Sequence, residues 1–247
     1  MSHWLLRQPG GERRFRLFCF SYAGGSAGPY LAWQPALPPH IEVCALQLPG
    51  RGPRLMEKPF RSLFQLVEVL APVIAREAAL PFAFFGHSLG GLLAFELARH
   101  CQRHGLPSPQ HLFVSATGAP RHRRDKPRLH ELGDEALIDA LRGYNGTPPA
   151  ELADRELMDL LLPAIRADFA LVETYAYKEG PQLDIPLTVL AGTQDSHVSP
   201  ASLPAWQEET SAAFDLHWFE GDHFFIHQQQ RAVTGCILAQ LAALQPA

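Results

Sequence analysis

Short apolar runs alternate along this chain with longer stretches in which apolar residues recur every three or four positions. The short runs are apolar almost throughout, which is typical of strands in a parallel sheet covered on both faces. They are also rich in valine, isoleucine and aromatic residues, as strands are. Strands are therefore predicted at residues 16–21, 41–46, 82–85, 112–116, 187–191 and 215–219.

Helical patterns fall between these strands. The segment 62–79 opens with Ser62 and then repeats apolar side chains at helical spacing, and serine is a residue type that caps helices. Further helices are predicted at 89–104 and 224–244. This alternation predicts an α/β protein with a doubly wound, mostly parallel central sheet and helices on both faces.

One region, residues 121–178, breaks the alternation because it has helical patterns near 134–142 and 155–175 but no strand pattern. We interpret it as a helical lid insertion that lies over one end of the sheet. Residues 1–120 and 179–247 then form the core. In the alternative interpretation, the region belongs to the ordinary helix layer.

Composition and charge narrow the class of protein. The chain has 247 residues, 47% of them hydrophobic, which suits one globular domain. Its net charge of −4 argues against a nucleic-acid binder. No apolar run is long enough to span a bilayer, and residues 1–16 lack the pattern of a secretory signal. We expect a cytoplasmic monomer with no membrane partner. Its four cysteines have no metal-ligand spacing, so we expect reduced thiols and no metal.

The most informative segment is Gly86-His87-Ser88-Leu89-Gly90. It follows an apolar strand and precedes an amphipathic helix, which is the context of the nucleophile elbow of α/β-hydrolases. The glycines allow the close backbone approach that such a tight turn requires. Ser88 is therefore the predicted nucleophile, and the predicted fold is an α/β-hydrolase fold.

A serine nucleophile needs a general base and a group that orients the base. In this fold the acid and then the histidine follow the serine along the chain. Asp195 follows the strand at 187–191 and His223 follows the last strand, so we predict the triad Ser88, Asp195 and His223. The rival acids are Asp184, Asp215 and Asp222, and the rival bases are His197, His217 and His227.

The oxyanion hole requires two backbone N–H donors. One donor should follow the nucleophile, and the second should lie in the loop after the first core strand. That loop is the glycine-rich segment 21–27. We assign the Leu89 and Ala23 N–H groups, and the alternative for the loop is a plain glycine-rich turn.

Several motifs, taken in order, resemble the type II thioesterases that accompany polyketide synthases and nonribosomal peptide synthetases. The likeness extends from about residue 16 to 244, although the family commonly has proline where Ser21 stands. The motif segments are 20–27, 48–54, 86–91, 162–169, 192–198 and 221–225.

The resemblance implies a stand-alone editing thioesterase. Such an enzyme clears stalled or wrong acyl groups from the phosphopantetheine arm of an acyl or peptidyl carrier protein, and it needs no cofactor of its own. The candidates for lining the acyl site are Tyr22, Phe169 and Phe224, with Leu160, Leu161, Ile165 and Leu171 in the lid. Residues at helical spacing are also explained by simple packing.

A basic run opens the insertion and could dock an acidic carrier protein, although it also reads as a solvated polar loop. Its members are Arg121, Arg123, Arg124, Lys126 and Arg128. Arg51 and Arg54 are interpreted as structural ion-pair partners outside the site. Two other functions stay open: a small-molecule carboxylesterase or lipase-like hydrolase, and a catalytically silent binding module of the same fold.

Overall fold

The computed structural model describes residues 3–122 and 128–243. A seven-stranded sheet forms its centre, in the order β1-β3-β2-β4-β5-β6-β7. All neighbouring strands are parallel except β1 and β3, which pair antiparallel. The strands are β1 Leu5–Leu6, β2 Phe15–Phe20, β3 Ile41–Leu46, β4 Phe82–His87, β5 Leu112–Ser115, β6 Leu187–Gly192 and β7 Phe214–Phe219.

The predicted fold class and all six predicted strands are confirmed, with ends that differ by at most two residues. The prediction missed β1, because two residues at the edge of a sheet leave no pattern in the sequence.

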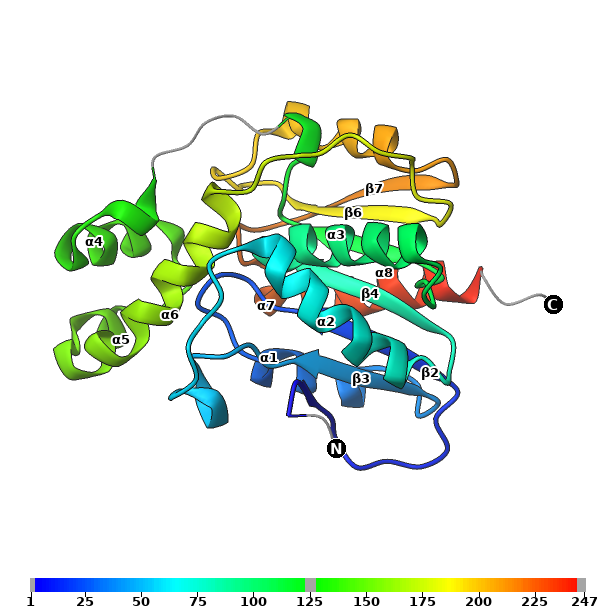
Figure 1. The fold of residues 1–247 in the computed structure, drawn as a ribbon, viewed down its shortest axis with the longest axis horizontal. Coiled ribbons are helices and arrows are strands. Elements are labelled where there is room, and N and C mark those ends of the chain that lie inside the picture. The colour runs from blue at the N-terminus through cyan, green and yellow to red at the C-terminus, as the bar shows by residue number, and fades with distance from the viewer. Residues whose placement is uncertain (1–2, 123–127, 244–247) are drawn as a thin grey trace.

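Eight α-helices surround the sheet in the described part of the chain (Figure 1). They are α1 Gly28–Leu31, α2 Leu63–Glu77, α3 Leu89–His104, α4 Asp134–Tyr144, α5 Pro149–Ala153, α6 Arg155–Glu173, α7 Phe225–Gln228 and α8 Gln230–Ala242. Short 3-10 turns lie at Gln34–Ala36, Gly52–Arg54, Pro120–His122, Leu129–Glu131, Pro200–Ser202 and Pro204–Glu209.

The predicted helices agree with α2 and α3, and Ser62 caps α2 by accepting a hydrogen bond from the Gln65 N–H. The single helix predicted at 224–244 was wrong. The backbone at Gln229 turns to φ −101° and ψ 26°, which leaves the helical region and divides the segment into α7 and α8.

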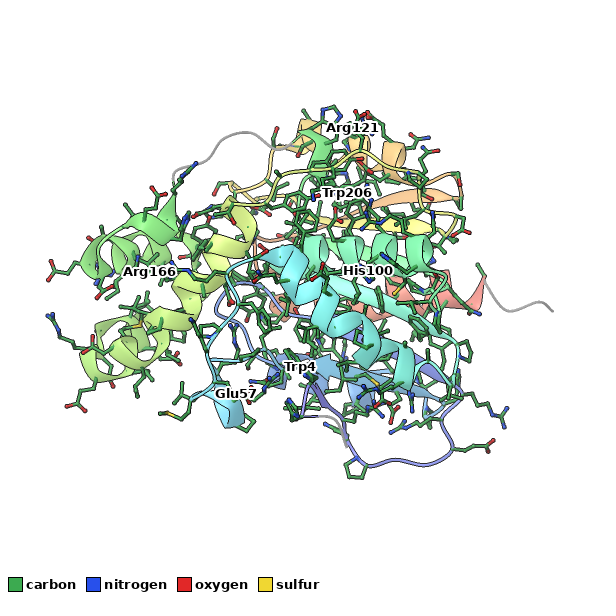
Figure 2. The ribbon with its side chains drawn as sticks, in the orientation of Figure 1. Trp4, Glu57, His100, Arg121, Arg166 and Trp206 are labelled. Atoms are coloured by element: carbon green, nitrogen blue, oxygen red, sulfur yellow. The ribbon has the colours of Figure 1, made fainter. Side chains whose placement is uncertain are left out.

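Two apolar cores lie on the two faces of the sheet. One packs α2 and α3 against the strands, and Trp206 is buried in it beside Phe95 of α3 (Figure 2). The other packs α1, α7 and α8 against the opposite face. None of the helices in residues 3–122 and 128–243 is both long and apolar enough to cross a bilayer.

Helices α4, α5 and α6 gather at one end of the sheet and share a third, smaller apolar cluster (Figure 1). Arg166 of α6, labelled in Figure 2, donates hydrogen bonds to the His130 and Leu132 carbonyls and pairs with Asp134. The Glu173 carboxylate accepts from His130 at 2.5 Å. These contacts join the start of this region to its last helix.

Candidate active site

The site lies at the point in the sheet where successive strands of the chain switch from one side of β2 to the other. The chain moves from β2 to β3 on one side and then crosses to β4 on the other side of β2. Loops that leave the carboxyl ends of such adjacent strands diverge and open a crevice, which is where α/β proteins bind ligands. The glycine-rich loop follows β2, and Ser88 follows β4.

Ser88 occupies a strained strand-to-helix turn. Its backbone has φ 55° and ψ −114°, an uncommon conformation for a residue with a side chain. A Cβ on Gly86 would lie 2.0 Å from the Gly90 carbonyl oxygen, so only glycine fits at position 86. The Ser88 N–H donates to the Ser115 carbonyl at 2.8 Å, which ties the turn to β5. The turn has the geometry of a nucleophile elbow.

His223 and Asp195 are hydrogen-bonded side by side beyond the ends of β7 and β6. His223 Nδ1 lies 2.8 Å from Asp195 Oδ2, and the His197 N–H donates to Asp195 Oδ1, also at 2.8 Å. Burial raises the pKa of Asp195, but the hydrogen bond and charge of His223 together with the His197 N–H outweigh it and lower the net pKa. The carboxylate is therefore held ionised beside the imidazole.

Ser88 and His223 line one cavity of about 1440 Å³, whereas Asp195 is not among its lining residues. Within the described residues, no hydrogen bond joins the Ser88 hydroxyl to the His223 ring. This bond is commonly long in enzymes without substrate and tightens in the complex. The structure thus brings the predicted serine and histidine to the same cavity and pairs the histidine with the predicted aspartate.

The two predicted oxyanion donors also line this cavity. Leu89 is the first residue of α3, so its N–H has no hydrogen-bond partner within the helix. Ala23 is the second residue of a turn in which the Gly25 N–H donates to the Tyr22 carbonyl at 2.9 Å. Neither N–H has an acceptor among the residues that the structure describes.

Of the predicted substrate-lining residues, Tyr22, Phe169 and Phe224 line the cavity, as do Leu161 and Ile165 of α6. Two of the lid candidates do not. Leu160 is 57% exposed, and Leu171 is buried in the core that packs α2 and α3 against the sheet. Helical spacing alone could not separate these faces of α6.

The rival residues have other partners. Asp215 accepts from Gln240 of α8, which also lies 3.5 Å from His217. His227 Nε2 lies 3.1 Å from the Tyr22 hydroxyl. Asp222 accepts from the Phe224 N–H, and the Asp184 N–H bonds Gln102.

Two rings next to His223, those of Tyr144 and His87, were not predicted as part of the site. Tyr144 of α4 stacks on His197 with ring centroids 3.8 Å apart, and both rings lie within 6 Å of His223. The centroid of the His87 ring lies 5.4 Å from that of the His223 ring. Burial, and after it the charges of His223 and His227, hold the pKa of His87 well below its ordinary value. The His87 ring beside the His223 imidazole is therefore neutral. Only its place within the elbow motif could have drawn attention to His87.

Within residues 3–122 and 128–243, no group of three or more histidine, cysteine, aspartate or glutamate side chains could hold a metal ion. Arg51 is paired with Asp168 and Arg54 with Glu57, in agreement with their interpretation as ion-pair partners.

A serine at a strand-to-helix elbow, a histidine at the same cavity and an aspartate bonded to that histidine, on a mostly parallel sheet, define a serine hydrolase of the α/β-hydrolase fold. A family model described as "Thioesterase domain" matches residues 15–241. The chain therefore belongs to the thioesterase family, and the predicted resemblance is confirmed.

Three relatives illustrate the likeness. The gramicidin S biosynthesis protein GrsT of Aneurinibacillus migulanus is 42% identical over 92% of this chain and 89% of its own. The type II thioesterase BorB from the borrelidin cluster has a TM-score of 0.89 at 40% identity, covering 96% of this chain and 97% of its own. YbtT, a type II thioesterase from the yersiniabactin NRPS/PKS pathway, has a TM-score of 0.83 at 31% identity, covering 96% and 97%.

Proposed function

We propose that this protein is a stand-alone type II thioesterase that hydrolyses acyl or aminoacyl thioesters on the phosphopantetheine arm of carrier proteins. It would thereby edit stalled or misprimed polyketide or nonribosomal peptide assembly lines. The relatives named as type II thioesterases support this class of substrate, since they match over nearly their whole length. The observation that carries the proposal is the cavity that Ser88, His223 and both N–H donors line together.

In the proposed reaction, His223 Nε2 accepts the Ser88 proton while Ser88 Oγ attacks the thioester carbonyl carbon. Asp195 stabilises the resulting imidazolium through the bond to Nδ1. The Leu89 and Ala23 N–H groups donate to the oxyanion. Collapse breaks the carbon–sulfur bond, and His223 returns the proton to the departing pantetheine thiolate. Water, deprotonated by His223, then attacks the carbonyl carbon of the acyl-serine. Collapse breaks the ester bond to Ser88 Oγ and releases the carboxylic acid, and His223 returns the proton to Ser88 Oγ.

We further propose that residues 121–178 form a lid over the core made by residues 1–120 and 179–247. The cavity wall supports this division because it takes Phe169 and Tyr144 from the helical region and Ser88 from the core. Tyr22, Phe169 and Phe224 are the proposed substrate-lining residues, and the acyl group would lie among them. The phosphopantetheine arm belongs to the partner, so the proposed chemistry needs no cofactor from this chain.

We also propose that the protein is a monomer and that it acts in the cytoplasm on a carrier-protein partner. The four cysteines agree with a reducing compartment, since each is free.

A hydrolysis panel tests the proposed substrate class. Acetyl, longer acyl and aminoacyl groups would be offered on a carrier protein, on a small thiol and as simple carboxylic esters. The proposal expects faster turnover of carrier-bound thioesters than of esters, with Ser88→Ala as the inactive control. A preference for simple esters would instead identify a small-molecule esterase.

A further inference from the structure

A buried ion pair joins α6 to a loop beside the site. Arg51 and Asp168 form a bidentate contact, with Nη1 to Oδ2 at 2.6 Å and Nη2 to Oδ1 at 2.7 Å. Their exposed fractions are only 5% and 1%. Burying two charges carries a large desolvation penalty, so such a pair is weak evidence for stability on its own. Its other hydrogen bonds indicate a different role.

The two atoms that make the shorter contact of the pair, Asp168 Oδ2 and Arg51 Nη1, also hold the loop that follows β2. Asp168 Oδ2 accepts the Gly24 N–H at 2.8 Å, and Arg51 Nη1 donates to the Gly25 carbonyl at 3.0 Å. The Asp168 carboxylate thus holds the N–H of Gly24, and the Arg51 guanidinium holds the carbonyl of the next residue, Gly25.

The turn in this loop sets the direction of the Ala23 N–H. Gly24 has φ +75° and is the third residue of a turn closed by the bond from the Gly25 N–H to the Tyr22 carbonyl. A positive φ at this position alone is the signature of a type II turn. The Tyr22 carbonyl and the Ala23 N–H belong to the same trans peptide and point in opposite directions. With the carbonyl held inside the turn, the Ala23 N–H points outward.

Helix α6 also contacts the turn directly. A Cβ on Gly24 would lie 3.2 Å from Ile165 Cγ1, one turn of α6 before Asp168. The turn is therefore in contact both with α6, through Ile165 and Asp168, and with Arg51.

We propose that Arg51 and Asp168 are positioning residues for the oxyanion hole. The pair holds the Ala23 N–H in its donating direction, and it does so only while α6 is seated on the loop. The seating of this lid helix is thereby coupled to the assembly of the hole. This inference rests on the proposed function, because it takes the Ala23 N–H as an oxyanion donor.

The substitution Asp168→Asn tests the inference because it keeps the shape of the side chain but turns an amide N–H₂ toward Arg51 or the Gly24 N–H. Removing one oxyanion donor lowers kcat by about 100- to 1,000-fold, so misplacing one should lower kcat by roughly 10- to 100-fold. KM should change less than about twofold, since the donor acts mainly on the transition state. Affinity for a trifluoromethyl ketone analogue, whose adduct places an oxyanion in the hole, should fall with kcat.

The matched control is Glu96→Gln, which breaks an equally buried pair with Arg99 at 2.8 Å inside α3. A comparable loss of Tm with kcat and analogue affinity unchanged is expected for this variant. If Asp168→Asn keeps its kcat, or loses it only in proportion to Tm as Glu96→Gln does, the inference is wrong.

Arg51→Lys is the second variant, should Asp168→Asn fold poorly. A lysine keeps the positive charge but cannot span both carboxylate oxygens and the Gly25 carbonyl with a fixed fork. We expect a smaller loss of kcat, again at constant KM. Unchanged kcat in this variant contradicts the inference.

Ala23→Pro separates this inference from the proposed function. Proline is favoured at this position of a type II turn and has no N–H, so it removes the donor and keeps the turn. If Ser88→Ala and Ala23→Pro are both severely impaired while Asp168→Asn is not, only the positioning role falls. If Ser88→Ala retains full turnover, the proposed function falls first.

Discussion

Asp195 shows how single residues set the chemistry of this site. Its carboxylate accepts from His223 and from the His197 N–H, and its pKa is lowered despite burial. Because this folded-state pKa lies below the unfolded value, the contribution of Asp195 to stability is present above the ordinary carboxyl pKa. The contribution is lost as pH falls through the lowered folded value.

Replacing Asp195 with asparagine should lower kcat by about 10⁴-fold with little change in KM, because the amide favours the wrong imidazole tautomer. Steady-state kinetics with a small acyl thioester measures the effect, and Tm shows that the variant is folded. A loss below about tenfold would assign the orienting role to another acid.

Some residue roles were within reach of the sequence, and others were not. Ser88, Asp195 and His223 each follow a recognisable strand, so their placement at the same end of the sheet could be predicted from topology. The partners Arg51 and Asp168 are 117 residues apart. Nothing in either local pattern indicates that α6 lies across the loop after β2, although the resemblance drew attention to both segments.

At the scale of elements, the elbow depends on contact between β2, β4 and α3. A Cβ on Gly90 would lie 2.0 Å from the Phe20 carbonyl oxygen, a backbone atom that cannot yield without moving β2. The helix therefore starts as close to the sheet as its backbone allows.

Gly90→Ala should lower the free energy of unfolding by about 3 kcal/mol, since the added methyl overpacks against backbone. Gly235→Ala is the matched control, because Gly235 lies within α8 with open space at the Cβ position. That change should stabilise the protein by about 0.5–1 kcal/mol. Urea titrations measure both, and equal effects would contradict the packing described for the elbow.

The contact between β5 and β6 carries a pH dependence. His111 immediately precedes β5 and lies 2.8 Å from the Thr188 hydroxyl of β6, and burial lowers its pKa to about 4. The unfolded chain binds this proton near pH 6.5, so stability falls as pH drops from about 6.5 to about 4, by roughly 3 kcal/mol in all.

His111→Gln keeps an amide near Thr188 and removes the titration. The loss of unfolding free energy between pH 7 and pH 4.5 should therefore be smaller than in the wild type. Denaturant titrations at the two pH values measure it, and the same loss in both proteins would show that His111 is not responsible.

Elements were predictable where their patterns were long and uniform. The central strands are apolar on both faces because helices cover both, and this pattern survives in the sequence. The edge strand β1 and the break at Gln229 depend on pairing and on local backbone conformation, for which so short a stretch carries no periodicity.

At the scale of the whole molecule, the basic run at residues 121–128 is the surface that we expect the proposed carrier protein to approach. The basic run is described only at its ends, where Arg121 pairs with Glu179 and Arg128 with Glu131. Arg123, Arg124 and Lys126 lie outside the described residues. An acidic partner would be attracted by such a run at a rate that falls with salt.

Charge reversal of Arg123, Arg124 and Lys126 to glutamate should lower kcat/KM for carrier-bound substrates several-fold at low salt. The kcat/KM for small thioesters should stay unchanged. The control reverses Arg14, Arg76 and Arg103, which are exposed near the opposite end of the sheet. Equal effects of the two triple variants, or equal effects on both substrates, would remove the basic run from docking.

The central claim is that the acyl group passes from a carrier thiol to Ser88 before it reaches water. The most direct measurement is rapid acid quench of the enzyme with an isotopically labelled acyl-carrier protein, followed by peptide mass spectrometry. The account predicts the acyl mass on the peptide that contains Ser88, formed together with free carrier thiol and absent from Ser88→Ala. Acid product that accumulates with no acyl adduct on Ser88, or with the adduct on another side chain, would contradict it.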